Sequence, residues 1–171
     1  MAILNYTTSI PVEKTISEIE KLLSQSGASK ILKEYDEKGN TESISFKILT
    51  EKGELPFRLP MNGKAVLQSL KDQSGQYKST KYGQKRLVPQ SMANREQADR
   101  VGWRIIKDWL EAQLALLFLQ MVKIEEIFLP YMYNERTGQT MFQVLEQKNF
   151  NFQIENKGGY KEDEEEKRIK N

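Results

Sequence analysis

Residues 91–120 read SMANREQADRVGWRIIKDWLEAQLALLFLQ, and this stretch decides the fold. Its apolar side chains recur every three or four residues, which predicts one long helix from Ser91 to Gln120 with Ser91 as the N-cap. The predicted inner stripe is Ala98, Val101, Ile105, Trp109, Ala112, Leu116 and Leu119, widened by Ile106, Leu110 and Leu117. Because the second half is apolar nearly all round, we expect it to form the centre of the core or an oligomer interface.

The residues on either side predict a small sheet that packs on helices. Before the long helix, the periodicity indicates a helix at 12–26, strands at 30–35, 43–50 and 55–59, and a helix at 62–73. Pro56 has no amide hydrogen, so the third strand is expected at an edge of the sheet. After the long helix we expect short helices at 123–128 and 139–147, then a strand through Phe150, Phe152 and Ile154. The fold class is therefore α+β, with a small three-stranded antiparallel sheet and one long central helix in a single domain at 1–154.

Two segments lack such periodicity. Residues 74–90 are rich in Ser, Gly, Gln and Lys, and we expect a mobile basic loop there. Residues 155–171 mix acidic and basic side chains after a Gly-Gly pair, which is typical of a disordered charged tail.

Composition excludes several classes of function. The 171 residues contain no cysteine and no histidine, which removes disulfides, thiolate chemistry, histidine bases and most zinc sites. Asp99 and Asp108 are nine residues apart, about 180° around a helix, so they cannot share a magnesium ion on one face. The N-terminus has no secretory signal pattern, and the apolar window at 114–122 is too short to cross a bilayer. We expect a non-enzymatic cytoplasmic protein of a bacterial host, without a cofactor or a metal.

The expectation of a bacterial host comes from a resemblance. The residues that carry it are Asn5-Tyr6-Thr7-Thr8, Phe57-Arg58-Leu59-Pro60, Gln97-Ala98-Asp99-Arg100, Trp103-Arg104, Lys107-Asp108-Trp109, Ala112-Gln113 and Phe128-Leu129-Pro130-Tyr131. The chain resembles, over most of residues 3–147, a family of small proteins carried by bacteriophages and prophages that has no assigned activity. The resemblance implies a phage-linked setting and no catalytic residues.

The first candidate site is the basic segment at 74–90. Its cations and rings are those that a single-stranded nucleic acid requires, cations for phosphates and tyrosines for stacking on bases. The candidate residues are Tyr77, Lys78, Lys81, Tyr82, Lys85 and Arg86. The alternative is a solvated linker whose lysines only keep it soluble.

A second candidate is an anion- or partner-binding surface spread over a strand face and the long helix. Its members are Lys47, Arg58, Arg95, Arg100, Arg104 and Lys107. The spacing of Glu96 with Arg100, and of Arg104 with Asp108, equally predicts ordinary ion pairs along a helix. Trp103 lies off the predicted apolar stripe, so of the two tryptophans it is the one that would contact a ligand, a neighbouring strand or another subunit. Core packing is the favoured expectation for both Trp103 and Trp109, and the Trp103 indole needs a hydrogen-bond partner if buried.

Two functions follow as hypotheses. The leading one is a phage or prophage accessory protein that binds nucleic acid, expected to be single-stranded, through the basic segment. The alternative is a phage counter-defence protein that inhibits a host immune protein or sequesters a signalling nucleotide. Self-association through Leu114, Leu117 and Phe118 is also predicted, with a monomer whose core is well covered as the alternative.

Overall fold

A computed structural model describes residues 2–151 of the chain and confirms the α+β class. In chain order the elements are α1 (Val12–Gln25), β1 (Ala28–Tyr35), β2 (Thr41–Thr50), β3 (Gly53–Arg58), α2 (Gly63–Ser74), β4 (Tyr77–Thr80), β5 (Gly83–Arg86), η1 (Gln90–Met92), α3 (Arg95–Phe118), α4 (Ile124–Phe128), η2 (Leu129–Tyr131) and α5 (Met141–Gln147). Strands β1, β2 and β3 form the predicted antiparallel sheet, and α3 is the predicted long helix. The remaining strands, β4 and β5, form a separate two-stranded sheet where a loop was expected.

The three-stranded sheet follows the alternation of its sequence. β2 is the central strand, and its Ile44, Phe46 and Ile48 are buried as predicted. β3 is an edge strand, as Pro56 required. Phe46 lies directly opposite Phe57 of β3, so the two rings share the inner face, 5.4 Å apart at their centroids.

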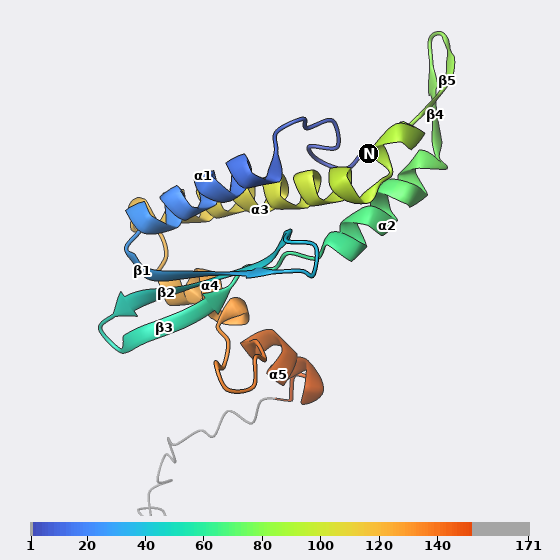
Figure 1. Ribbon diagram of the computed structural model, residues 1–171. Coiled ribbons are helices and arrows are strands. Elements are labelled where there is room, and N and C mark those ends of the chain that lie inside the picture. The colour runs from blue at the N-terminus through green and yellow to red at the C-terminus, as the bar shows by residue number, and fades with distance from the viewer. Residues whose placement is uncertain (1, 152–171) are drawn as a thin grey trace, which may run out of the picture.

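Helices α1 and α3 lie side by side over that inner face (Figure 1). Ile16, Ile19 and Leu23 of α1 are buried in the core, at the predicted spacing. Phe128 of α4 closes the core against Phe46, with 5.5 Å between ring centroids and an edge-to-face arrangement. Such pairs contribute about 0.5–1.5 kcal/mol beyond the area they bury, so this aromatic cluster fixes how the helices sit on the sheet.

The stripe predicted for α3 is wrong in its second half. Ile106 and Leu110, which were predicted to widen the stripe, are buried. Trp103 and Leu114, which were not part of it, are buried as well, whereas Ala112 and Leu119 of the predicted stripe are exposed. Because the helix is apolar on most of its surface, its own periodicity allows more than one stripe, and packing against the sheet selects between them. Trp103 does not lie off the core face, where the predicted stripe placed it, and the expectation that both tryptophans pack in the core is confirmed. Trp103 is fully buried, and its Nε1 donates to the Thr41 carbonyl at 3.3 Å, which supplies the partner that a buried indole needs.

Helix α3 begins four residues later than predicted. Its N-cap is Asn94, whose side-chain oxygen accepts from the Gln97 backbone N–H at 2.9 Å, and Ser91 lies in η1. Asn94 is as good a cap as Ser91 would be. The later start of α3 therefore follows from the path of the preceding segment, which begins at Pro89, and not from a difference in capping strength.

The segment after α4 crosses to the other side of the sheet. Met132 pairs with Phe57 at the free edge of β3, and the Tyr133 N–H donates to the Pro56 carbonyl at 3.1 Å. Helix α5 then lies on the sheet side opposite α1 and α3 (Figure 1). Phe150 is not in a strand and has a φ of +53°. Phe152, Ile154 and the predicted tail at 155–171 lie outside the described residues.

The stretches that carry the phage resemblance make contacts that hold the fold together. The buried Gln97 amide donates to the carbonyls of Tyr6 and Thr8, at 2.8 and 2.9 Å, and Asn5 donates to Asp108 at 2.8 Å. These bonds pin the N-terminal segment along α3. The stretches are therefore explained by packing and point to no site.

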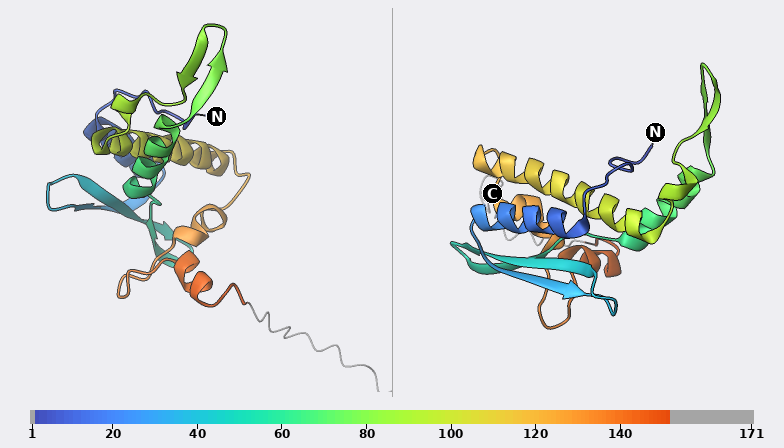
Figure 2. Two further views of the ribbon diagram at one scale, coloured as in Figure 1. Left: turned by 90° about the vertical axis from the view of Figure 1, so that its right-hand side faces the viewer. Right: turned by 45° about the horizontal axis from the view of Figure 1, so that its top comes forward.

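The β4–β5 hairpin stands away from the rest of the molecule. It continues from the end of α2 and projects beyond both helices of the main layer, as all three views show (Figures 1 and 2). Its base is held by a second small cluster, in which Val88 is fully buried against Leu70 and Ala98. Within residues 2–151, no helix is long and apolar enough to cross a membrane.

Candidate nucleic-acid interface

The predicted basic loop at 74–90 is a β-hairpin for most of its length, so the expectation of a segment without secondary structure is wrong. Tyr77–Thr80 pairs with Gly83–Arg86, and Lys81 and Tyr82 form the turn between them. The turn is fixed by Thr80, whose hydroxyl donates to the Gly83 carbonyl at 2.7 Å and accepts from the Tyr82 N–H at 3.3 Å. Gly83 has a φ of +112°, a conformation that glycine adopts without strain.

Several bonds attach this hairpin to the body at its base. The Leu87 N–H donates to the Gln76 carbonyl at 2.9 Å, which closes the hairpin below its last strand pair. The Arg86 guanidinium donates to the Ser74 carbonyl at the end of α2 and to the Gln90 side chain. Arg86 therefore serves to anchor the hairpin, in addition to any ligand it meets.

The strand register sorts the hairpin residues onto two faces. In an antiparallel pair, residues directly opposite each other share a face and successive residues alternate. One face carries Tyr77 opposite Arg86 and Ser79 opposite Gln84, and the other carries Lys78 opposite Lys85 and Thr80 opposite Gly83. All of these residues are exposed except Arg86, which is half-buried. The hairpin thus has no buried face of its own.

The pairing of Lys78 with Lys85 works against the stability of the hairpin. Like charges directly opposite each other destabilise a strand pair, by up to about 1 kcal/mol. An isolated two-stranded hairpin is marginal in water even without that repulsion. The two lysines are therefore not explained by the folding of the segment that carries them.

Within residues 2–151, no carboxylate pairs with the cations of the hairpin. The sequence between Asp72 and Glu96 contains Lys78, Lys81, Lys85, Arg86 and Arg95 and no acidic residue. In the part of the chain that the structure describes, the four hairpin cations form no ion pair. The described part of the chain therefore places these cations together at the end of a projecting arm without a carboxylate beside them.

The two tyrosines of the segment lie at opposite ends of the hairpin. Tyr77 is at the base, where the Arg86 guanidinium covers its ring at 5.0 Å from the centroid. Tyr82 is in the turn with 92% of its surface exposed. The Lys81 ammonium lies 6.0 Å from the centroid of the Tyr82 ring. Both rings thus have a cation of the hairpin beside them, and Tyr82 is the more exposed of the two.

The second candidate surface is different, because each of its six cations has a carboxylate. On α3, Arg95 binds Asp99, Arg100 binds Glu96 and Lys107 binds Glu111, and Arg104 binds both Asp108 on its own helix and Glu18 of α1. The predicted ion pairs of Glu96 with Arg100 and of Arg104 with Asp108 are confirmed. The Arg104–Glu18 pair, at 2.6 Å, joins the two helices of the main layer and was not predicted.

Lys47 and Arg58 face the C-terminal segment on the outer side of the sheet. Lys47 binds Glu135 at 2.6 Å, and this hydrogen bond raises the pKa of the lysine. Arg58 stacks over the Tyr133 ring at 4.7 Å and donates to the Gly138 carbonyl at 3.3 Å, besides its ion pair with Glu34. The strand face predicted to be free for an anion is therefore covered in part by the chain itself.

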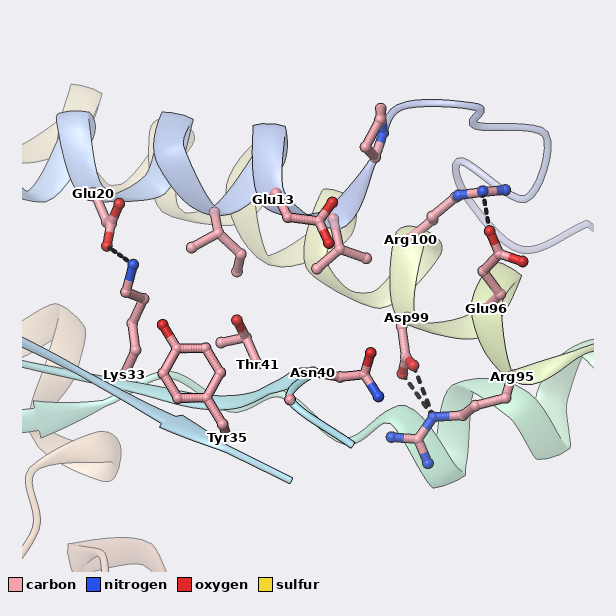
Figure 3. Close-up of a pocket in the computed structure, with 14 residues that line it drawn as sticks. Glu13, Glu20, Lys33, Tyr35, Asn40, Thr41, Arg95, Glu96, Asp99 and Arg100 are labelled. Atoms are coloured by element: carbon pink, nitrogen blue, oxygen red, sulfur yellow. Dashed lines mark hydrogen bonds and ion pairs between the residues drawn. The ribbon is translucent and has the colours of Figure 1, made fainter. Parts of the chain in front are cut away.

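A hollow of about 720 Å³ opens between α1, α3 and the β1–β2 end of the sheet (Figure 3). Three of its cations are paired with carboxylates that also line it: Lys33 with Glu20, Arg95 with Asp99, and Arg100 with Glu96. The Asp99 hydrogen bonds raise the pKa of Arg95, and the Glu20 hydrogen bond raises that of Lys33. With Glu13 as a fourth carboxylate, the lining carries one more negative than positive charge, which disfavours an anionic nucleotide.

The three residues predicted to form an oligomer contact differ in their exposure. Leu114 is buried and Leu117 packs against the core, whereas Phe118 is 86% exposed. Leu119 and Met121 are exposed beside it. Self-association stays a prediction, with Phe118 as the residue of the three that is available for it.

No protein-family model, no curated protein and no solved structure matches this chain. The candidate site is therefore judged by its geometry and charge alone.

Proposed function

We propose that this protein binds nucleic acid through the β4–β5 hairpin and performs no catalysis. The observation that carries the proposal is the contrast in charge: each of the six body cations named above has a carboxylate, whereas the hairpin cations have none among the residues that the structure describes. Phosphates would supply the missing negative charge. The phage or prophage setting implied by the sequence resemblance is part of the proposal.

The position of the hairpin supports the same ligand. An exposed cluster of one sign attracts a polyanion over a distance of about 8–10 Å in physiological salt and speeds its association. The cluster projects from the body (Figure 2), so a long polyanion reaches it without meeting the carboxylates of α1 and α3. The repulsion between Lys78 and Lys85 would also be relieved once a phosphate lies between them.

Fluorescence anisotropy with labelled single-stranded DNA, duplex DNA and RNA tests the proposal. With three or four phosphate contacts, the affinity should fall about 20- to 150-fold between about 50 mM and about 200 mM salt. The variant K78Q/K81Q/K85Q should bind far more weakly, and its plot of log affinity against log salt should be shallower by about 2 to 3.

A matched control removes three lysines from the body. Lys14, Lys21 and Lys52 are exposed and, within residues 2–151, form no ion pair, so K14Q/K21Q/K52Q changes the net charge equally. It should bind like the wild type. Equal losses in both variants, or no binding by the wild type to any of the three nucleic acids, would overturn the proposal.

The alternative of a counter-defence protein has less support. Arg58 lies on the outer side of the sheet, whereas Arg100 and Arg104 are on α3 over the inner side, so these cations do not converge on one nucleotide. The hollow beside Arg100 carries a negative balance. An inhibitory contact with a host protein stays the prediction to pursue if nucleic acids do not bind.

A further inference from the structure

We infer that the hairpin enters the major groove of double-stranded DNA. The inference rests on the proposed function and narrows its ligand to a B-form duplex, in place of the single strand expected from the sequence. Three observations support this inference: the shape of the hairpin, the different side chains on its two faces, and the positions of the two tyrosines.

The hairpin has the dimensions of a groove-binding ribbon. Its two strands lie about 5 Å apart, and four residues per strand give a length of about 13 Å before the turn. The major groove of B-DNA is about 12 Å wide and about 8.5 Å deep, and it admits a two-stranded ribbon. The hairpin is thus long enough to reach the groove floor while its base stays outside.

Both faces of the ribbon offer groups that a groove would meet. Lys78 and Lys85 make one face cationic, and Lys81 adds charge at the tip. The opposite face presents Ser79 beside Gln84, whose side chains have no hydrogen-bond partner within the described residues. Cations suit the phosphate walls of a groove, and hydroxyl and amide groups suit the base edges on its floor.

A single strand would use the hairpin poorly. Binding to single strands depends on aromatic rings that stack on successive bases along one surface. Tyr77 and Tyr82 are separated by the length of β4, and Arg86 already covers Tyr77. One exposed ring at the tip, with the Lys81 ammonium 6.0 Å from its centroid, gives no platform for successive bases, but it can reach into a groove ahead of the strands.

Double-stranded RNA is disfavoured by shape. The A-form major groove is deep and too narrow for side chains to read. An RNA duplex of the same sequence therefore carries the same charge but lacks a major groove wide enough for the hairpin. Comparing the affinities for duplex RNA and duplex DNA separates the effect of groove shape from that of charge.

The first test compares affinities for one sequence of about 20 base pairs as duplex DNA, as each DNA strand alone and as duplex RNA. We expect the DNA duplex to bind at least about ten-fold more tightly than either single strand or the RNA duplex. Equal or tighter binding to the single strands would overturn the groove assignment and leave the proposed function standing. No binding to any of the four ligands would overturn both.

The second test locates the groove by dimethyl sulfate footprinting on the duplex. Guanine N7 lies on the major groove and adenine N3 on the minor groove. Protection of guanine N7 that disappears with K78Q/K81Q/K85Q is the expected result. Protection at adenine N3 alone, or none at saturation, would contradict entry into the major groove.

A variant of the polar face tests which side meets the bases. S79A/Q84A should weaken duplex binding about five-fold or more without changing the salt slope, because it removes hydrogen bonds and no charge. S24A/Q25A makes the same chemical change at exposed positions of α1 and should have no effect. Unchanged duplex affinity in S79A/Q84A would overturn the assignment of this face to the groove floor.

Discussion

Aromatic and basic side chains occur in both the body and the hairpin, but their surroundings differ between the two regions. In the body, aromatic rings are packed against one another, as Phe46, Phe57 and Phe128 are, and the candidate cations are held by carboxylates. In the hairpin, Tyr82 is exposed and Lys78 lies opposite another lysine. The contacts of these body residues are explained by folding, whereas the proposed binding of nucleic acid would explain the exposed ring and the paired lysines of the hairpin.

That difference teaches how to treat a charged side chain in a new sequence. Arg104 is as basic as Lys85, but its bond to Glu18 at 2.6 Å satisfies it within the molecule. A single unpaired lysine is no evidence for a ligand, as Lys14, Lys21 and Lys52 show in the described part of the chain. A cluster of cations without a carboxylate beside it is such evidence, and more so when the position of its members costs stability.

Replacement of Phe128 by alanine should produce the largest loss of stability. Phe128 is fully buried against three other aromatic rings, so its removal leaves a cavity and should lower the free energy of unfolding by about 3–5 kcal/mol. Urea denaturation followed by circular dichroism measures it. Phe118→Ala makes the same change at an exposed position and should shift stability by no more than about 0.5 kcal/mol. Similar losses in the two variants would contradict the placement of the core.

The Arg104–Glu18 pair should give a measurable coupling between α1 and α3. Both side chains are half-buried and joined by a hydrogen bond, so a double-mutant cycle with R104A and E18A should give about 0.5–1 kcal/mol. The Arg100–Glu96 pair lies within one helix, and its Glu96 is largely exposed. It should give about 0.3–0.5 kcal/mol. A larger coupling for the second pair would contradict the role of the first in joining the helices.

Lys85→Glu should stabilise the hairpin and weaken the binding of nucleic acid. It turns the like-charged pair with Lys78 into an opposite-charged one, a gain of about 0.2–1 kcal/mol in local stability. The Gln76–Leu87 bond and the register place Lys78 and Gly83 in hydrogen-bonded pairs of the hairpin. Hydrogen exchange of the Lys78 and Gly83 amides should slow, while anisotropy shows weaker binding. Faster exchange would contradict the register, and tighter binding would contradict the proposed ligand.

The smallest expected effect is a loss of stability in the turn between β1 and β2 at acidic pH. Asp36 accepts hydrogen bonds from the side chain and backbone N–H of Asn40, which lower the pKa of its carboxyl. Because the pKa of Asp36 is lower in the folded protein than in the unfolded chain, the ionised carboxylate stabilises the fold. This stabilisation is present above the pKa of the unfolded chain, about 4, and is lost as the pH falls through the pKa of the folded protein. An NMR titration of Asp36 in the wild type and in Asn40→Ala measures it. An unshifted pKa in the wild type would contradict this turn geometry.

Much of the body follows from its sequence. Periodicity located α1, the three strands of the sheet and α2, because their buried residues recur at regular steps and Gly or Pro marks their ends. The face of α3 could not be predicted in the same way. Its surface is apolar on several sides, and only the sheet decides that Trp103 is buried.

The hairpin was missed for a physical reason. A strand is recognised by apolar residues that alternate with polar ones, and a strand with no buried face has no such pattern. The available signal was local: Tyr77, Thr80 and Tyr82 favour strands, and Gly83 follows two residues that can form a turn. The residues of the site were predicted, but their arrangement on two faces, and with it Ser79 and Gln84, required the register.

Long-range partners were also beyond the sequence. Pairs four residues apart on a helix, such as Glu96 with Arg100, follow from spacing alone. Arg58 meets Gly138 and Tyr133, and Arg104 meets Glu18, only because the chain folds back on itself. Because of these partners, the cations that were predicted to form an anion-binding surface make contacts within the protein instead.

Removal of the hairpin tests the division between body and hairpin most directly. Gln76 and Leu87 are already hydrogen-bonded, so two glycines can replace Tyr77–Arg86 and join them while Val88 stays in its cluster. On this one variant, both the free energy of unfolding and the affinity for duplex DNA are measured. We predict a change in stability within about 1 kcal/mol together with loss of DNA binding. Retained DNA binding by a folded variant would contradict the account.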